Sequence, residues 1–338
     1  GLQTETNRFA AVGDEAFAPF SRTRQRALFA FEELATGWGR LTFGARAESV
    51  TVDSLGNPDV PRFAPASRSF RPRSLALGTL VRLAPGWEFT ANLASSQRAP
   101  RDYELFADGP HVATGAYEVG NSALGVEKSA NVDVGVAWKS GPNRFALNGF
   151  VNRFRNFISL EATGNTRADD GTLNPADPTD AVPEFAYRGV PARLVGLEAN
   201  GSVRLLQGAQ TVDLELSADA VRATNRDTGQ PLPRIAPLRA GAALVYASGP
   251  WSARLGATRA ARQDRVPAGE LPTDGYTLVQ ASLGYQVKAG PANLLWFARL
   301  DNATDRLAYS ASSILTQTAP GRAPLPGRGV QLGLRASF

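Results

Sequence analysis

The feature that most constrains this chain is an alternation of apolar and polar side chains with a period of two residues. From Leu41 to Glu48, apolar residues occupy every odd position, and Thr, Gly, Arg and Glu occupy the even ones. Successive side chains of a β-strand point to opposite faces, so this pattern predicts strands with one oily and one polar face. A first strand is expected to place Ala27, Phe29 and Phe31 on one face. The pattern recurs in Leu75–Leu83, Trp87–Leu93, Val132–Trp138, Val212–Ala218 and Val330–Phe338.

The number and length of these segments indicate a membrane-spanning wall. We expect about thirteen strands of roughly ten residues or a little more, the length that a tilted strand needs to cross a bilayer, plus a stub at Gly1–Ala10. One segment, Phe145 to Phe157, is irregular because Phe150 and Phe154 fall opposite Leu147 and Val151. The expected fold is all-β: an antiparallel transmembrane β-barrel of outer-membrane type, present in part.

The connections alternate in length as regularly as the side chains alternate in polarity. Short turns such as K-S-G-P-N and A-S-G-P-W are separated by one longer loop each, and all five tryptophans lie near the short turns. Outer-membrane barrels have short periplasmic turns, long external loops and girdles of aromatic residues at the membrane interfaces. A soluble β-sandwich also alternates, but it does not need to segregate its loops by length. The pattern therefore favours a barrel with its long loops outside the cell.

Composition excludes several other classes. Of the 338 residues, 43% are hydrophobic, yet no apolar run approaches the roughly 18 residues of a transmembrane helix. The chain has no cysteine, which removes disulfides, thiolate metal sites and cysteine nucleophiles. A formal charge of +5 permits nucleic-acid binding, but Arg alternates with Asp and Glu along the strands, so no basic face and no nucleic-acid partner is expected. With no methionine and no signal peptide at Gly1, the chain is expected to be a portion of a longer protein.

Between two alternating segments lies the stretch from Gln97 to Lys128, which contains the only histidine, His111. Its Gly, Pro and Ala content predicts a loop without helix that joins two antiparallel strands. The run R-A-P-x-x-x-E-L-F-x-x-G-P-H-x-A-T-x-x-Y-E-x-G-N-x-x-L-x-x-E resembles the corresponding part of TonB-dependent outer-membrane receptors.

This resemblance implies much about the whole protein. Residues 1–338 would be the C-terminal part of a barrel that closes with about twenty-two strands in this family, without the early strands and the N-terminal plug. The protein would lie in the bacterial outer membrane, in contact with lipid and lipopolysaccharide. It would be an importer and not an enzyme, energised by the TonB complex through the plug.

Four residues of the loop are candidate metal ligands: His111, Asp108, Glu104 and Glu118. Imidazole and carboxylate groups suit zinc, although their spacing matches no specific motif, and an exposed histidine among solvated acids is the alternative. The resemblance is greatest to the zinc and metal-uptake branch, so zinc or a metal chelate is the expected cargo, and no cofactor is required. A ferric-siderophore receptor and a passive porin or translocator barrel remain open as alternatives.

Further loop residues bear on these alternatives. Loop arginines are expected to contact an anionic chelate or lipopolysaccharide phosphates; they are Arg62, Arg68, Arg71, Arg73, Arg259, Arg262 and Arg265. The stretch from Glu161 to Glu184 is predicted to be a mobile acidic loop and lacks the spacing of a calcium loop. A catalytic triad would need His111 with Ser122 or Ser129, and no G-x-S-x-G motif accompanies them.

Overall fold

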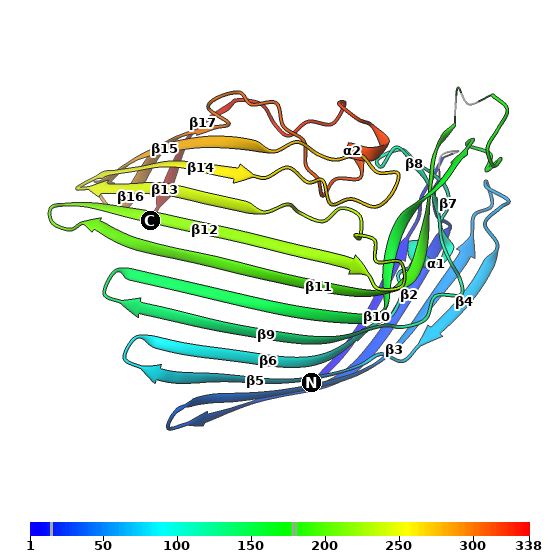
Figure 1. Ribbon diagram of the computed structural model, residues 1–338, viewed down its shortest axis with the longest axis horizontal. Coiled ribbons are helices and arrows are strands. Elements are labelled where there is room, and N and C mark those ends of the chain that lie inside the picture. The colour runs from blue at the N-terminus through cyan, green and yellow to red at the C-terminus, as the bar shows by residue number, and fades with distance from the viewer. Residues whose placement is uncertain (14–15, 178, 180) are drawn as a thin grey trace.

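The computed structural model describes residues 1–13, 16–177, 179 and 181–338, and its strands form one curved wall (Figure 1). The sheet has 17 strands. Fourteen of them follow one another around the wall in chain order. They are β1 (Leu2–Phe9), β2 (Phe20–Thr36), β3 (Gly39–Gly56), β5 (Arg73–Ala84), β6 (Trp87–Arg98), β9 (Glu127–Ser140), β10 (Asn143–Arg167), β11 (Val182–Leu206), β12 (Gln210–Asn225), β13 (Arg239–Ser248), β14 (Trp251–Ala260), β15 (Tyr276–Ala289), β16 (Ala292–Asp301) and β17 (Gly329–Ser337).

The predicted partial barrel is confirmed. Neighbouring wall strands are antiparallel, β1 pairs with β2, β17 pairs with β16, and the wall is not closed into a full barrel. The expected stub at Gly1–Ala10 is β1. Three further strands and two short helices lie at the long-loop end: β4 (Pro65–Phe70), β7 (Asp108–His111), β8 (Ala116–Val119), α1 (Asp102–Phe106) and α2 (Leu315–Thr318). In the described part of the chain, no helix is long and apolar enough to cross a membrane.

The short turns gather at one end of the wall, on the left of Figure 1. The pairs Thr36–Gly39, Ser140–Asn143 and Ser248–Trp251 each enclose only two residues. Near these turns the rings of Trp87 and Trp138 lie 6.2 Å apart. The predicted separation of short turns from long loops is therefore confirmed. We call the opposite end, which carries the long loops, the mouth.

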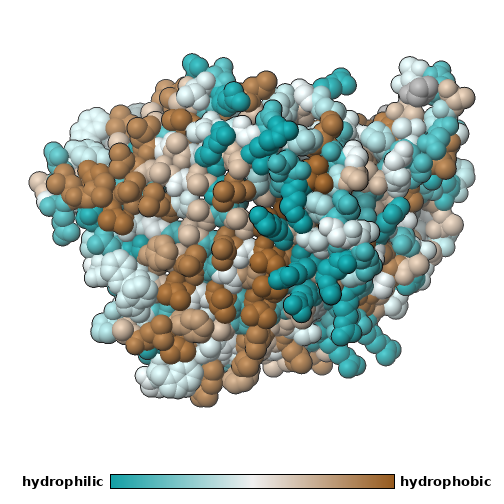
Figure 2. Space-filling model, viewed as in Figure 1, coloured by the Kyte–Doolittle hydropathy of each residue, from teal (hydrophilic) through white to brown (hydrophobic). Residues whose placement is uncertain are grey.

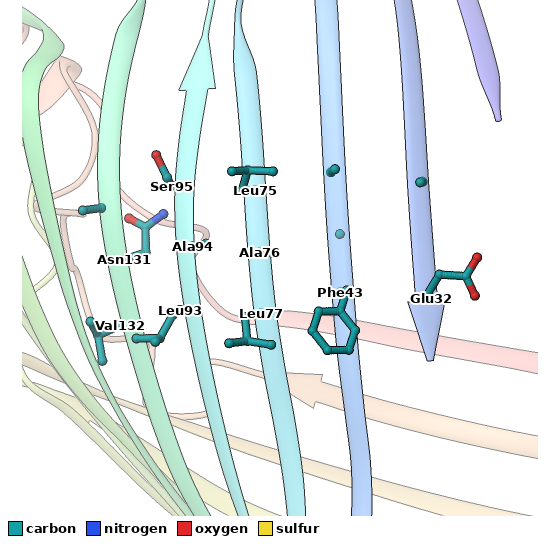
Figure 3. A pocket seen from close by; sticks show the side chains of 14 residues that line it. Glu32, Phe43, Leu75, Ala76, Leu77, Leu93, Ala94, Ser95, Asn131 and Val132 are labelled. Atoms are coloured by element: carbon teal, nitrogen blue, oxygen red, sulfur yellow. The ribbon is translucent and has the colours of Figure 1, made fainter. Parts of the chain in front are cut away.

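Strand register shows which side chains share the outward face of the wall. Phe43 pairs with Leu77, Leu77 with Leu93, and Leu93 with Val132, so these apolar side chains form one row across four strands. They are exposed, as lipid-facing residues must be in a barrel wall. In Figure 2, brown residues accordingly form patches over the half of the wall nearer the short turns. Figure 3 shows the row from close by, with Phe43, Leu77, Leu93 and Val132 side by side.

Ala27, Phe29 and Phe31 share one face of β2, as expected, but this is not the outward face. Phe29 pairs with Arg46, and Phe31 with Gly44, so the oily set Ala27, Phe29 and Phe31 lies on the polar inner face of β3. The Arg46 guanidinium lies 5.8 Å from the centre of the Phe29 ring, a cation–π contact. β2 has apolar residues on both faces, so alternation alone did not define its outward side.

The irregular segment from Phe145 to Phe157 coincides with a β-bulge between Phe154 and Phe157. In this bulge the Asn156 amide donates to the Val126 carbonyl over 2.6 Å, which anchors the start of β9. Beyond the bulge, β10 and β11 continue far past the rest of the wall. The two ends of the predicted loop from Glu161 to Glu184 are therefore strand, since β10 runs to Arg167 and β11 begins at Val182.

Candidate ligand-binding mouth

The stretch between β6 and β9 is folded, and the prediction that it contains no helix is wrong for the five residues of α1. Its first turn is capped by Glu104, whose carboxylate accepts the Arg101 backbone N–H over 2.7 Å. The side chain of Leu105 is buried in an apolar cluster that joins α1 to four strands. This tertiary contact stabilises a helix that composition alone does not favour. The cluster consists of Val50, Val52, Phe70, Leu105, Ala107, Leu124, Ile158 and Tyr187.

Next along the chain, β7 and β8 form a hairpin, and β8 adds to the wall as a parallel neighbour of β11. Tyr117 pairs with Glu184, and Val119 with Ala186. That edge of β11 is free because β12 stops pairing with it at Ala192, while β10 occupies the other edge. The loop thus crosses the β10–β11 hairpin, and Tyr117 is fully buried.

His111 lies in this hairpin beside Glu118, and its Nδ1 is 2.8 Å from Glu118 Oε1. The imidazole stacks on the Phe17 ring, with centroids 4.0 Å apart and planes within 5°. Thr114 donates to the same carboxylate oxygen over 3.1 Å, and the Tyr187 hydroxyl donates to the other over 3.0 Å. Burial, followed by the negative charge of Glu118, raises the pKa of Tyr187, which keeps this hydroxyl a donor. Glu118, only 2% exposed, therefore has partners on both oxygens.

The other two predicted ligands have different partners. Glu104 accepts two hydrogen bonds from Arg98, at 3.1 and 2.8 Å. Asp108 accepts one from the Tyr117 hydroxyl at 2.9 Å. The structure thus brings His111 and Glu118 together and leaves Glu104 and Asp108 in separate contacts. Within the described ranges, no group of three or more His, Cys, Asp or Glu residues is placed to hold a metal ion. The metal-binding role of the four residues stays a prediction.

The residues that complete the His111 environment come from distant parts of the chain. Tyr187 is 69 positions from Glu118, and Phe17 precedes the loop by a similar stretch. Neither residue could be predicted from the sequence, because no local spacing connects it to His111. Only the aromatic character of F-A-Y-R at Phe185–Arg188 was available as a signal.

Contacts across the mouth connect this loop to two others. Thr318, at the end of α2, donates to the Thr114 carbonyl over 2.5 Å. Next to it, the Gln317 amide bonds both the backbone N–H and the carbonyl of Leu271, at 2.7 and 2.9 Å. Figure 1 shows α2 close to β8 at this end. Hydrogen bonds therefore join three loops of the mouth to one another.

Most of the arginines that were predicted to bind a ligand instead form hydrogen bonds or ion pairs with residues of the mouth. Arg62 bonds the carbonyls of Asp108 and Ala16, and Arg68 bonds that of Leu124. Arg265 bonds the Ala223 carbonyl over 2.8 Å, and Arg262 pairs with Asp274. The other three, Arg71, Arg73 and Arg259, are exposed, as is Arg262.

A match to a known protein family identifies the β-sheet wall. The family described as TonB dependent receptor-like, beta-barrel matches residues 2–303. The chain belongs to the TonB-dependent receptor barrels. It is accordingly an outer-membrane protein of a family of receptors, not of enzymes.

Solved structures with the same fold are distant in sequence. The copper transporter OprC superimposes with a TM-score of 0.74 at 20% identity, over 94% of this chain and 48% of that one. A mutant of the ferric enterobactin receptor PfeA from Pseudomonas aeruginosa gives 0.60 at 20% identity, over 100% and 59%. The ferric-catecholate receptor Fiu from E. coli K12 gives 0.61 at 18%, over 93% and 44%. The chain thus spans about half the length of these receptors.

Proposed function

We propose that this chain forms the wall and mouth of an active outer-membrane transporter for a scarce metal or metal chelate, energised through TonB. The observation that carries the proposal is the mouth, where the loop of His111 and Glu118 is hydrogen-bonded to the loop of Thr318, which is in turn bonded to the loop of Leu271. A passive porin needs an open lumen. The packed loops therefore favour a gated importer over a porin or translocator.

For the cargo we propose zinc first and a ferric siderophore or another chelate second. His111 and Glu118 offer one imidazole and one carboxylate, a ligand set that suits zinc. Glu104 and Asp108, which have partners of their own, would support the loop unless a cargo ion displaces those partners. Further ligands would then come from outside the loop. The chelate alternative is supported by the solved relatives, whose names refer to copper and ferric enterobactin.

Growth under metal limitation tests both parts of the proposal. A strain without the complete receptor should regain growth under zinc limitation when the wild-type gene is returned, and should not regain it with His111→Ala/Glu118→Ala. Ser122→Ala, an exposed change in the same loop, is the matched control and should restore growth fully. Rescue under iron limitation alone would contradict zinc and support a chelate. Rescue that persists without TonB would contradict active transport.

A further inference from the structure

The hydrogen bonds of Glu118 determine which ring nitrogen of His111 carries a proton. Both carboxylate oxygens of Glu118 accept a hydrogen bond, from Thr114 at 3.1 Å and from Tyr187 at 3.0 Å. His111 Nδ1 lies 2.8 Å from Glu118 Oε1, and because a carboxylate oxygen only accepts, Nδ1 is the donor. A neutral imidazole has one N–H and one nitrogen lone pair. In the neutral ring of His111, the lone pair is therefore on Nε2.

The orientation of this imidazole is fixed by two contacts. The Phe17 ring lies parallel to it, with centroids 4.0 Å apart, and covers one face. Glu118 holds the edge that carries Nδ1. The His111 side chain is still 27% exposed, and among the described residues its Nε2 has no hydrogen-bond partner. Nε2 is thus the ring atom that remains for a ligand.

The carboxylate next to His111 has the place of a partner that orients a metal-binding histidine. Such a histidine donates its other ring N–H to a carboxylate, which fixes the tautomer and makes the binding nitrogen more basic. Glu118 is buried and already hydrogen-bonded by Thr114 and Tyr187. It is therefore better placed to orient the imidazole than to bind a metal ion itself, and the pair supplies a single nitrogen ligand.

A single nitrogen ligand restricts the cargo. Zinc sites built by a protein alone use three or four protein ligands, and in the part of the chain that the structure describes no group of three His, Cys, Asp or Glu residues is placed to supply them. A metal that is already held by an organic chelator needs fewer.

Apolar side chains near the imidazole also favour a chelated metal. Phe9, which packs edge-on against Phe17, is 42% exposed, and Val112, next to His111 in the chain, is 66% exposed. An organic chelator can cover such side chains, whereas a hydrated ion gains nothing from them.

We propose that His111 binds, through Nε2, a metal complex whose organic chelator leaves one coordination position open, and that Glu118 is its positioning residue. The imidazole nitrogen replaces a labile water on the metal, so no bond of the chelator breaks and the oxidation state of the metal does not change. This inference rests on the proposed function and names the class of its cargo. Zinc in such a chelator belongs to this class, but a ferric siderophore that fills every coordination position does not.

Calorimetry on the complete receptor, purified with an affinity tag that contains no histidine, tests the inference with three probes. Copper(II) terpyridine has an open equatorial position, copper(II) bis-terpyridine has none, and aqueous Zn²⁺ has no chelator. His111→Ala should weaken binding of copper(II) terpyridine about tenfold or more and leave binding of the other two probes unchanged. Electron paramagnetic resonance should show one added nitrogen ligand on the copper in the wild type only.

Glu118→Gln tests the positioning role. An amide donates as well as accepts, so it does not fix the tautomer, and affinity for copper(II) terpyridine should fall about tenfold. Nitrogen NMR of the histidine-labelled receptor should show an unprotonated His111 Nε2 in the wild type and both tautomers in Glu118→Gln, a change that a merely structural role would not produce. Ser122→Ala, the control in the same loop, should change neither measurement.

Three results would overturn the inference. They are equal binding of copper(II) terpyridine by the wild type and His111→Ala, binding of aqueous Zn²⁺ that is lost in His111→Ala, and a protonated Nε2 in the neutral ring of the wild type. None of them contradicts active transport, which growth under metal limitation tests separately.

Discussion

At the residue scale, the mouth depends on carboxylates whose partners are buried with them. Glu118 is the central one, since it accepts hydrogen bonds from Tyr187 and Thr114 and contacts His111. A buried carboxylate that loses a donor bears a desolvation cost that a surface carboxylate does not. Tyr187 therefore matters more for the order of the loop than its distance in sequence suggests.

Tyr187→Phe should destabilise the packed loop by about 1–3 kcal/mol, because one Glu118 oxygen loses its buried donor. Hydrogen exchange should become faster in residues 102–124 and stay unchanged in the wall strands. Tyr309→Phe is the control, since that hydroxyl bonds the Gly321 carbonyl at an exposed position. Unchanged exchange in residues 102–124 of the Tyr187 variant would show that the hydroxyl does not hold the loop.

A second residue-scale prediction concerns the turn A-T-G-W-G. A Cβ at Gly39 would overlap the Leu80 backbone oxygen of the neighbouring strand, whereas a Cβ at Gly37 would meet nothing within 4 Å. Gly39→Ala should therefore reduce the heat-modifiable folded fraction on gels, and Gly37→Ala should not. Equal folding of the two variants would contradict the close approach of β3 and β5.

At the element scale, alternation predicted the wall well and the mouth poorly. Val132–Trp138 and Val330–Phe338 form strands with the expected outward faces, because lipid on one side imposes the pattern. On β2, alternation grouped Phe29 and Phe31 on one face but did not show that this face lies inward beside Arg46. Helix α1 could not be predicted, since a tertiary contact with Val50 stabilises it. The residues around His111 could not be predicted either, since Phe17 and Tyr187 reach the site only through tertiary contacts. The sequence grouped His111 with Asp108, Glu104 and Glu118 as candidate ligands, and the structure places Glu118 against His111 and gives Glu104 and Asp108 other partners.

The extended β10–β11 hairpin supports a pH prediction at the same scale. Burial tends to raise the pKa of Glu184, but hydrogen bonds from Thr163, Arg167 and Asn165 outweigh it and lower the pKa overall. A lowered pKa stabilises the hairpin tip above the unfolded value, near 4.3, and this stability is lost as pH falls through the folded value. Pepsin cleavage at residues 168–177 should rise as pH falls from about 5 to 3.

Glu184→Gln should show most of this susceptibility already at the upper end of the range. Glu161→Gln, on the paired strand and without a salt bridge among the described residues, should behave as wild type. A pH profile that is the same for all three proteins would contradict a role for Glu184 in the tip.

At the scale of the whole molecule, the wall has three zones between its short-turn end and its mouth. The short turns and tryptophans lie at one end, the apolar rows of the outward face lie between the ends, and the long loops form the mouth at the other end. We expect the mouth to lie outside the cell, because the long loops of outer-membrane barrels are external, and the transport proposal depends on that orientation.

Cysteine labelling measures this orientation most directly, because the chain contains no cysteine of its own. Ser122→Cys places a thiol on the loop of the mouth, and Ser140→Cys places one beside a short turn; both positions are exposed. A membrane-impermeant maleimide added to intact cells should label Ser122→Cys and leave Ser140→Cys unlabelled until the outer membrane is opened. Labelling of Ser140→Cys alone in intact cells would contradict the account.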